Sequence, residues 1–164
     1  MVGNVAGVIA AIAAGISAFW AWWVYRGQSR SADFELARSL HQDLTSGEVA
    51  RARDTLTRYR LTGQCASTAE TVHAYFTLLW CFERVLRGRE SISRRSRSTS
   101  THPALDYLDE CTDWHLKQWE HDFPEIRQRL KAELGTRTLD NEDTLASFKT
   151  LARDVAASRE RRHG

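Results

Sequence analysis

The chain has 164 residues, of which 27% are charged and 42% hydrophobic, and its formal net charge is +2. So small a net charge does not indicate nucleic-acid binding by the chain as a whole. The three cysteines, Cys65, Cys81 and Cys111, show no CxxC spacing. This excludes a disulfide framework and predicts reduced cysteines that pack as small apolar residues.

The first 25 residues contain no charged side chain. Residues 2–25 read VGNVAGVIAAIAAGISAFWAWWVY. Apart from the tryptophans and the tyrosine, Asn4 and Ser17 are the only residues of this stretch with a polar side-chain group. As a helix this stretch measures about 36 Å, against about 30 Å for the hydrocarbon core of a bilayer. A continuous apolar run of that length is typical of a transmembrane helix. We therefore predict one membrane span over residues 2–25.

Aromatic residues lie at the C-terminal end of the predicted span. The residues predicted to lie at the membrane interface are Trp20, Trp22, Trp23, Tyr25 and Arg26. Tryptophan and tyrosine favour the interface because an apolar ring there carries a polar atom that meets water. Arg26 and Arg30 follow the span and no lysine or arginine precedes it. The positive-inside rule then places the N-terminus outside and the C-terminal part in the cytoplasm, at a cell inner membrane or plasma membrane.

Two other interpretations of this stretch compete with a span. A cleaved secretory signal has a basic n-region and an apolar core of about 7–15 residues that ends in small side chains. Here MVGN has no basic residue, and the apolar run is longer and ends in bulky aromatics. An interfacial amphipathic helix has a charged face, which these residues lack.

Small residues recur every four positions within the predicted span. Gly3, Gly7, Ala11 and Gly15 form this ridge on one face of a helix. Such small-xxx-small patterns allow two membrane helices to approach closely. Alanine and glycine are also common in spans that do not pair, and this alternative stays open.

The rest of the chain is predicted to be helical. Residues 26–33, RGQSRSAD, are expected to form a polar hinge, and residues 34–157 a bundle of about five helices. The predicted helical segments are 34–44, 48–61, 67–88, 103–122, 124–134 and a last one capped by Asp140 or Asn141. The segment 67–88 is apolar on most of its surface, including Trp80, which predicts a central position. Residues 158–164, SRERRHG, are predicted to be a fraying polar tail.

A basic segment interrupts the bundle. Residues 89–101, RESISRRSRSTST, lack apolar periodicity and are predicted to form a mobile loop. The arginines predicted to bind anionic lipid are Arg84, Arg87, Arg89, Arg94, Arg95 and Arg97. Clusters of this size on a membrane-tethered segment attract acidic headgroups. Two alternatives are a merely solubilising loop and, less favoured because no aromatic residues are interleaved, a nucleic-acid site.

Cys111 and His115 are the strongest candidates for chemistry. They lie four residues apart and so share one face of a helix, within the acidic stretch DECTDWHLKQWEHD. Cysteine and histidine are zinc ligands, but no HExxH or CxxC motif accompanies them. A packed cysteine and histidine beside a solvated acidic face is the favoured interpretation. No metal, other cofactor or catalytic residue is assigned, and no P-loop, GxGxxG or GxSxG motif is present.

The layout resembles a known family. The resemblance rests on five features: the predicted span, the basic hinge, RARDTL on an early helix, AYFTLLWCFERVLRGRESI, and LDYLDECTDWHLKQWEHDFPEIRQRL. The layout is similar to a bacterial family of single-span membrane proteins of unknown function, the domain of unknown function four-seven-six-zero, over about residues 1–134. The Ser/Arg segment at 91–101 departs from that family. The resemblance implies no catalytic residue.

Together these features predict an all-α protein with one N-terminal transmembrane helix and a cytoplasmic helical bundle. The expected function is a non-enzymatic, membrane-tethered interaction or scaffold module that binds membrane lipid and pairs with itself or with another membrane protein. The alternatives are a small membrane-bound metal-dependent enzyme that uses Cys111 and His115, and a tethered nucleic-acid-binding domain that uses the arginines.

We predict that replacing Gly7 and Gly15 with isoleucine reduces self-association in membranes, because branched side chains keep the two backbones apart. The measurement is the yield of chemically crosslinked dimer from native membranes. An unchanged dimer yield would rule out pairing through the ridge.

Overall fold

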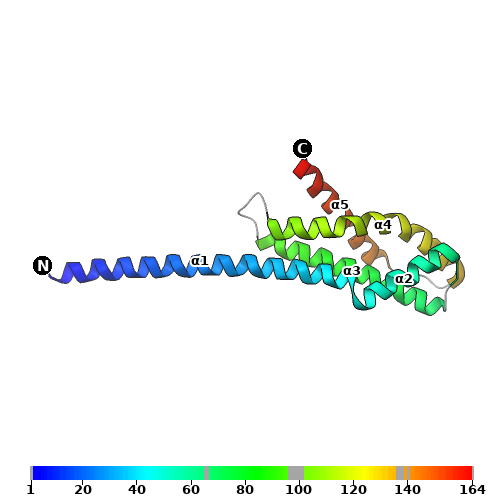
Figure 1. The fold of residues 1–164 in the computed structure, drawn as a ribbon, viewed down its shortest axis with the longest axis horizontal. Helices are drawn as coiled ribbons and strands as arrows, with labels where there is room; N and C mark the ends of the chain where they lie inside the picture. Colours follow the sequence, from blue (N-terminus) through cyan, green and yellow to red (C-terminus); the bar gives the residue numbers. More distant parts are fainter. Residues whose placement is uncertain (1, 65–66, 96–101, 136–138, 140, 164) are drawn as a thin grey trace. The chain divides into compact units, whose positions relative to one another are not determined.

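The computed structural model describes the backbone of residues 2–64, 67–95, 102–135, 139 and 141–163, and their side chains except at residues 2–13, 26 and 163 (Figure 1). The described residues form an all-helical fold, as predicted. The helices are α1 (Val2–Thr45), α2 (Gly47–Thr62), α3 (Thr68–Arg95), α4 (Pro103–Leu134) and α5 (Glu142–His163). The chain divides into two compact units, Met1–Glu35 and Leu36–Gly164.

No helix in the described part of the chain is both long enough and apolar enough to cross a bilayer. Residues 2–13 form the first half of the predicted span, and their side chains lie outside the described residues. The transmembrane helix stays a prediction.

The predicted hinge at residues 26–33 is wrong as a break in the helix, because α1 continues through it. The segment RGQSRSAD contains one glycine and no proline. A single glycine inside a helix costs only about 1 kcal/mol relative to alanine. Helix-forming residues on both sides offset that cost, so the predicted span and the predicted segment 34–44 belong to one helix.

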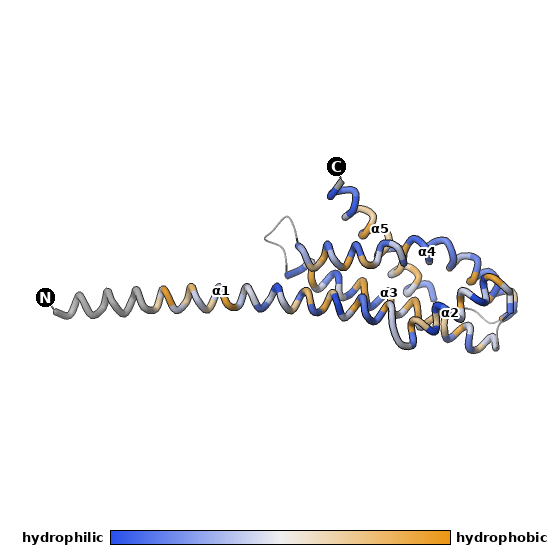
Figure 2. The backbone as a smooth tube through the Cα atoms, in the orientation of Figure 1, coloured by the Kyte–Doolittle hydropathy of each residue, from blue (hydrophilic) through white to orange (hydrophobic). Residues whose placement is uncertain are grey.

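The aromatic core joins α3, α4 and α5. Phe82 of α3, Phe123 of α4 and Phe148 of α5 meet with ring centroids 5.0–6.2 Å apart, mostly edge to face. Trp119 lies 5.3 Å from Phe123 between ring centroids and has no exposed surface. Helix α3 also contacts α2, which agrees with the prediction that this helix is central. Figure 2 shows the hydrophobic positions of these helices alternating with hydrophilic ones along each helix, as amphipathic helices require.

Helix α3 does not end at Gly88 but reaches Arg95. A Cβ atom at position 88 would overlap the Cδ1 atom of Leu40, so the glycine allows α1 and α3 to pack closely. Beyond it, Ile92 is fully buried and holds the next turn against the core. The predicted loop at 89–101 is therefore wrong for residues 89–95, while residues 96–101 lie outside the described residues.

The predicted break at residues 122–124 is also wrong, because α4 contains Pro124 in its interior. Proline removes one helical hydrogen bond and costs about 3 kcal/mol. Phe123 and Ile126 on either side of it are buried. Burial of large apolar side chains is worth about 1.5–3 kcal/mol each, which offsets the cost of the proline.

Helix α5 likewise extends through residues 158–163, where a polar tail was predicted. Ser158 is buried. Arg159 and Arg162 form ion pairs with Asp113 and Asp106 of α4, at 3.5 and 3.7 Å. Two arginines of this segment therefore pair with a neighbouring helix, and the backbone continues as part of α5 through residue 163.

Candidate interaction surfaces

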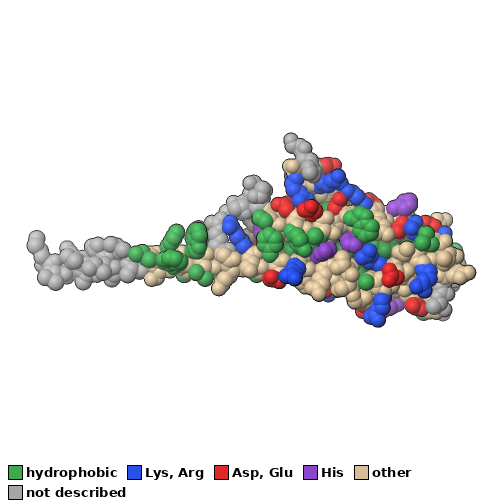
Figure 3. Space-filling view, viewed as in Figure 1, with side chains coloured by type: hydrophobic (Ala, Val, Ile, Leu, Met, Phe, Trp, Pro, Cys, Tyr) green, Lys and Arg blue, Asp and Glu red, His purple; other side chains and the backbone are tan. Residues whose placement is uncertain are grey.

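Aromatic side chains are exposed along one stretch of α1, within the first compact unit. Phe19, Trp20, Trp22, Trp23 and Tyr25 have between 50% and 73% of their surface exposed. The ring of Phe19 lies 6.1 Å from that of Trp22 and 6.3 Å from that of Trp23 between centroids. Figure 3 shows this stretch as a band of hydrophobic side chains with no charged ones among them. We call these five residues the aromatic belt.

The small-residue ridge is described only at its end. Gly15 lies in α1, and a Cβ atom at this position would meet nothing within 4 Å. The side chains of residues 2–13, which include positions 3, 7 and 11, lie outside the described residues, as does the side chain of Arg26. Pairing through the ridge stays a prediction.

The predicted lipid-binding arginines separate into two groups. Arg84, Arg87, Arg94 and Arg95 are exposed on α3, and Arg97 lies outside the described residues. Arg89 is 9% exposed. The prediction that Arg89 binds lipid is therefore wrong, because its side chain points into the bundle.

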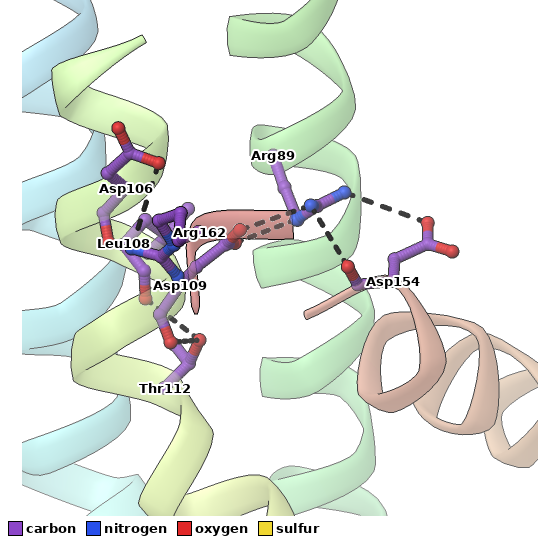
Figure 4. A network of polar contacts seen from close by, with 7 residues as sticks. All are labelled: Arg89, Asp106, Leu108, Asp109, Thr112, Asp154 and Arg162. Carbon is purple, nitrogen blue, oxygen red and sulfur yellow. Dashed lines mark hydrogen bonds and ion pairs between the residues drawn. The ribbon is translucent and has the colours of Figure 1, made fainter. Parts of the chain in front are cut away.

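Arg89 instead connects three helices (Figure 4). Its Nε and Nη2 atoms donate to the two carboxylate oxygens of Asp109, on α4, at 2.8 and 3.2 Å. Nη2 also donates to the backbone carbonyl of Asp154, on α5, at 3.4 Å, and Nη1 lies 3.7 Å from the Asp154 carboxylate. Asp109 has no exposed surface. A bidentate pair of this kind fixes the relative orientation of the two groups as well as their distance.

Cys111 and His115 both lie on α4, and the two side chains have different surroundings. The hydrogen bond with Cys111 is the main cause that raises the pKa of Tyr107, and burial adds to it. Burial is the main cause that lowers the pKa of His115 to about 4, with smaller contributions from the electrostatic effects of Arg53 and His41. Within the described residues, no group of three or more His, Cys, Asp and Glu side chains is placed to hold a metal ion.

The described cysteines are free thiols. Cys81 is buried in α3, and burial raises its pKa to about 11 although the nearby Arg84 lowers it. A thiol with so high a pKa stays protonated at neutral pH and packs as an apolar side chain. Cys65 lies outside the described residues.

Two tryptophans of the bundle are exposed, which the sequence did not reveal. Trp80 was predicted to widen the apolar stripe of its helix, but 55% of its surface is exposed. Trp114 on α4 is 60% exposed and lies against His115, with ring centroids 4.9 Å apart. Both residues lie in helices with broad apolar faces, so periodicity alone does not tell an edge position from a core position.

Comparisons with known proteins give no relative of this chain. No protein-family model, no curated protein and no solved structure matches it. The resemblance to the domain of unknown function four-seven-six-zero stays a prediction, and the proposals below rest on the residues themselves.

We expect replacement of Arg89 by methionine to lower the free energy of unfolding by about 3–5 kcal/mol, because the buried Asp109 carboxylate would lose its compensating charge. The matched control is Arg87→Met on the same helix. Arg87 is exposed and pairs with Glu90 at 3.5 Å, so its loss should cost at most about 1 kcal/mol. Urea unfolding followed by circular dichroism measures both. Equal losses for the two variants would contradict a structural role for Arg89.

We expect stability to fall as the pH falls from about 6.5 to about 4 because of His115. Its Nδ1 atom is buried with no hydrogen-bond partner among the described residues, so the folded state disfavours the charged ring. The unfolded chain binds the proton at the ordinary pKa of 6.5 and the folded chain only near 4. The folded state therefore loses up to about 3.5 kcal/mol below that window, at about 1.4 kcal/mol per pKa unit.

The variant His115→Gln should flatten this part of the stability profile, measured by urea unfolding at several pH values. The control is His73→Gln, since His73 is exposed and its Nε2 atom lies 3.0 Å from the carboxylate of the exposed Glu48. A profile that keeps its full slope in His115→Gln would show that another group is responsible.

Proposed function

We propose that this chain is a single-pass membrane protein whose helical bundle is tethered at the cytoplasmic face and acts there as a non-enzymatic interaction or scaffold module. The observation that carries the proposal is the aromatic belt. Five large aromatic side chains are exposed to solvent within seven residues of one helix. Exposed apolar surface of this extent marks a contact with a membrane or with another protein.

The surroundings of the belt favour a membrane as the contact. The belt follows a stretch without any charged side chain and precedes Arg26 and Arg30. Tryptophan and tyrosine between an apolar stretch and basic residues are typical of the boundary between lipid and water. The same arrangement supports an orientation with the bundle in the cytoplasm.

The bundle offers apolar side chains for partner proteins. Leu61 of α2 and Trp114 of α4 are more than half exposed. Tryptophan is enriched at the centres of protein interfaces because it buries a large area at low entropic cost. This supports a binding role for the bundle.

We expect the unaltered chain to stay in the membrane pellet after alkaline carbonate washing. The double variant Ala14→Arg/Ala18→Arg should move to the supernatant, because each arginine near the bilayer centre opposes insertion by about 2.5–3.5 kcal/mol. Both alanines are exposed on α1.

The matched control is Ala132→Arg/Ala146→Arg, which makes the same substitutions at exposed positions of α4 and α5. It should stay in the pellet. Release of the unaltered chain by carbonate would overturn the tether. Equal retention of all three proteins would show that the stretch around Ala14 does not enter lipid.

A further inference from the structure

The outer face of α3 combines a tryptophan with arginines. Trp80, Arg84, Arg87 and Arg94 are exposed. At 100° per residue, their spacings of four, three and seven place them within about 80° of one another around the helix. They extend over about 21 Å along the helix axis at 1.5 Å per residue. Arg95 is exposed beside them and donates a hydrogen bond to Ser91 at 2.8 Å.

The outermost charges of this face are positive. Glu90 pairs with both Arg87 and Arg94, at 3.5 and 3.1 Å, so one carboxylate serves two guanidinium groups. Arg84 lies 3.4 Å from Asp43 of α1. Asp43, Glu83 and Glu90 are half-buried, whereas the four arginines are exposed. A planar surface that approaches α3 from outside therefore meets the guanidinium groups first.

Trp80 supplies an apolar contact at one end of the face. Its ring lies 5.6 Å from that of Phe76 between centroids, tilted by 35°. Phe76 is packed against the core and holds the indole at the surface. An indole beside exposed arginines suits the headgroup layer of a bilayer, where the ring meets acyl chains and the guanidinium groups meet phosphates.

We propose that this face of α3, formed by Trp80, Arg84, Arg87, Arg94 and Arg95, binds anionic phospholipid headgroups. The inference rests on the proposed tether, because a tethered domain meets the bilayer at a high effective concentration, so a modest contact is enough. The mixed charge beside the arginines disfavours nucleic acid, whose binding requires that several phosphates be neutralised at once.

The test uses the full chain in nanodiscs of phosphatidylcholine, with and without phosphatidylserine, and quenching of tryptophan fluorescence by brominated lipid. The aromatic belt should be quenched in both lipids. Phosphatidylserine should add a further increment of quenching that comes from Trp80. The increment should disappear in Trp80→Phe and remain in Trp114→Phe, which removes the other exposed tryptophan of the bundle.

The role of the arginines is tested by two variants that each remove four positive charges, one on the α3 face and one elsewhere. The variant Arg84→Gln/Arg87→Gln/Arg94→Gln/Arg95→Gln should lose the increment. The control Arg51→Gln/Arg58→Gln/Arg153→Gln/Arg161→Gln, with four exposed arginines of α2 and α5, should keep it. Circular dichroism verifies that each variant is folded.

The outcomes separate the two proposals. If the belt is quenched but phosphatidylserine adds nothing, or adds an increment that neither Trp80 nor the four arginines affects, the α3 face does not bind lipid. If the same arginine variant instead loses salt-sensitive binding to a DNA duplex, the face binds nucleic acid and the lipid proposal is overturned. If the belt itself is not quenched in either lipid, the tether is wrong.

Discussion

The buried ion pair between Arg89 and Asp109 is the constraint on which the arrangement of α3, α4 and α5 depends. A buried carboxylate without a cation is very costly, so α3 and α4 must meet where these two side chains meet. Arg89 and Phe82 are seven residues apart and thus share one face of α3. The contact of Phe82 with Phe123 and Phe148 buries apolar area, and the ion pair, which includes Asp154, fixes how the helices are aligned along their axes.

This constraint also divides the arginine-rich segment into an inner and an outer part. One arginine, Arg89, turns inward to the acids of α4 and α5. Arg87, two positions away, and Arg84 and Arg94, five positions away, stay on the outside with Trp80. The two proposed contacts with lipid, at α1 and at α3, thus have the same kind of side chains. The aromatic belt of α1 and the outer face of α3 each combine indole rings with nearby basic residues. Such a combination fits a layer that is apolar on one side and anionic on the other.

The helical class and most of the helical positions were predictable, because apolar residues at intervals of three and four positions indicate amphipathic helices wherever they occur. Local residues also mark helix ends: Ser67 accepts a hydrogen bond from the backbone N–H of Glu70 at 3.1 Å, and Gly63 ends α2 with a φ of 67°. The errors lie at the hinge around Gly27, at Gly88 and at Pro124. Each is a local helix-breaking signal worth about 1–3 kcal/mol. At Gly88 and Pro124 the burial of neighbouring apolar side chains exceeds this cost. At Gly27 the helix-forming residues on both sides offset it.

The sequence by itself determined the all-helical fold, the uncharged stretch before Arg26 and the aromatic residues at the end of that stretch, because these properties depend on residues within a few turns of one another. Only the tertiary structure decided that Arg89 is buried and that Trp80 is exposed. The partners of Arg89 are 20 and 65 positions away in the chain. A run of arginines looks the same in sequence whether its members face water or a carboxylate on another helix, since burial depends on which helices pack together.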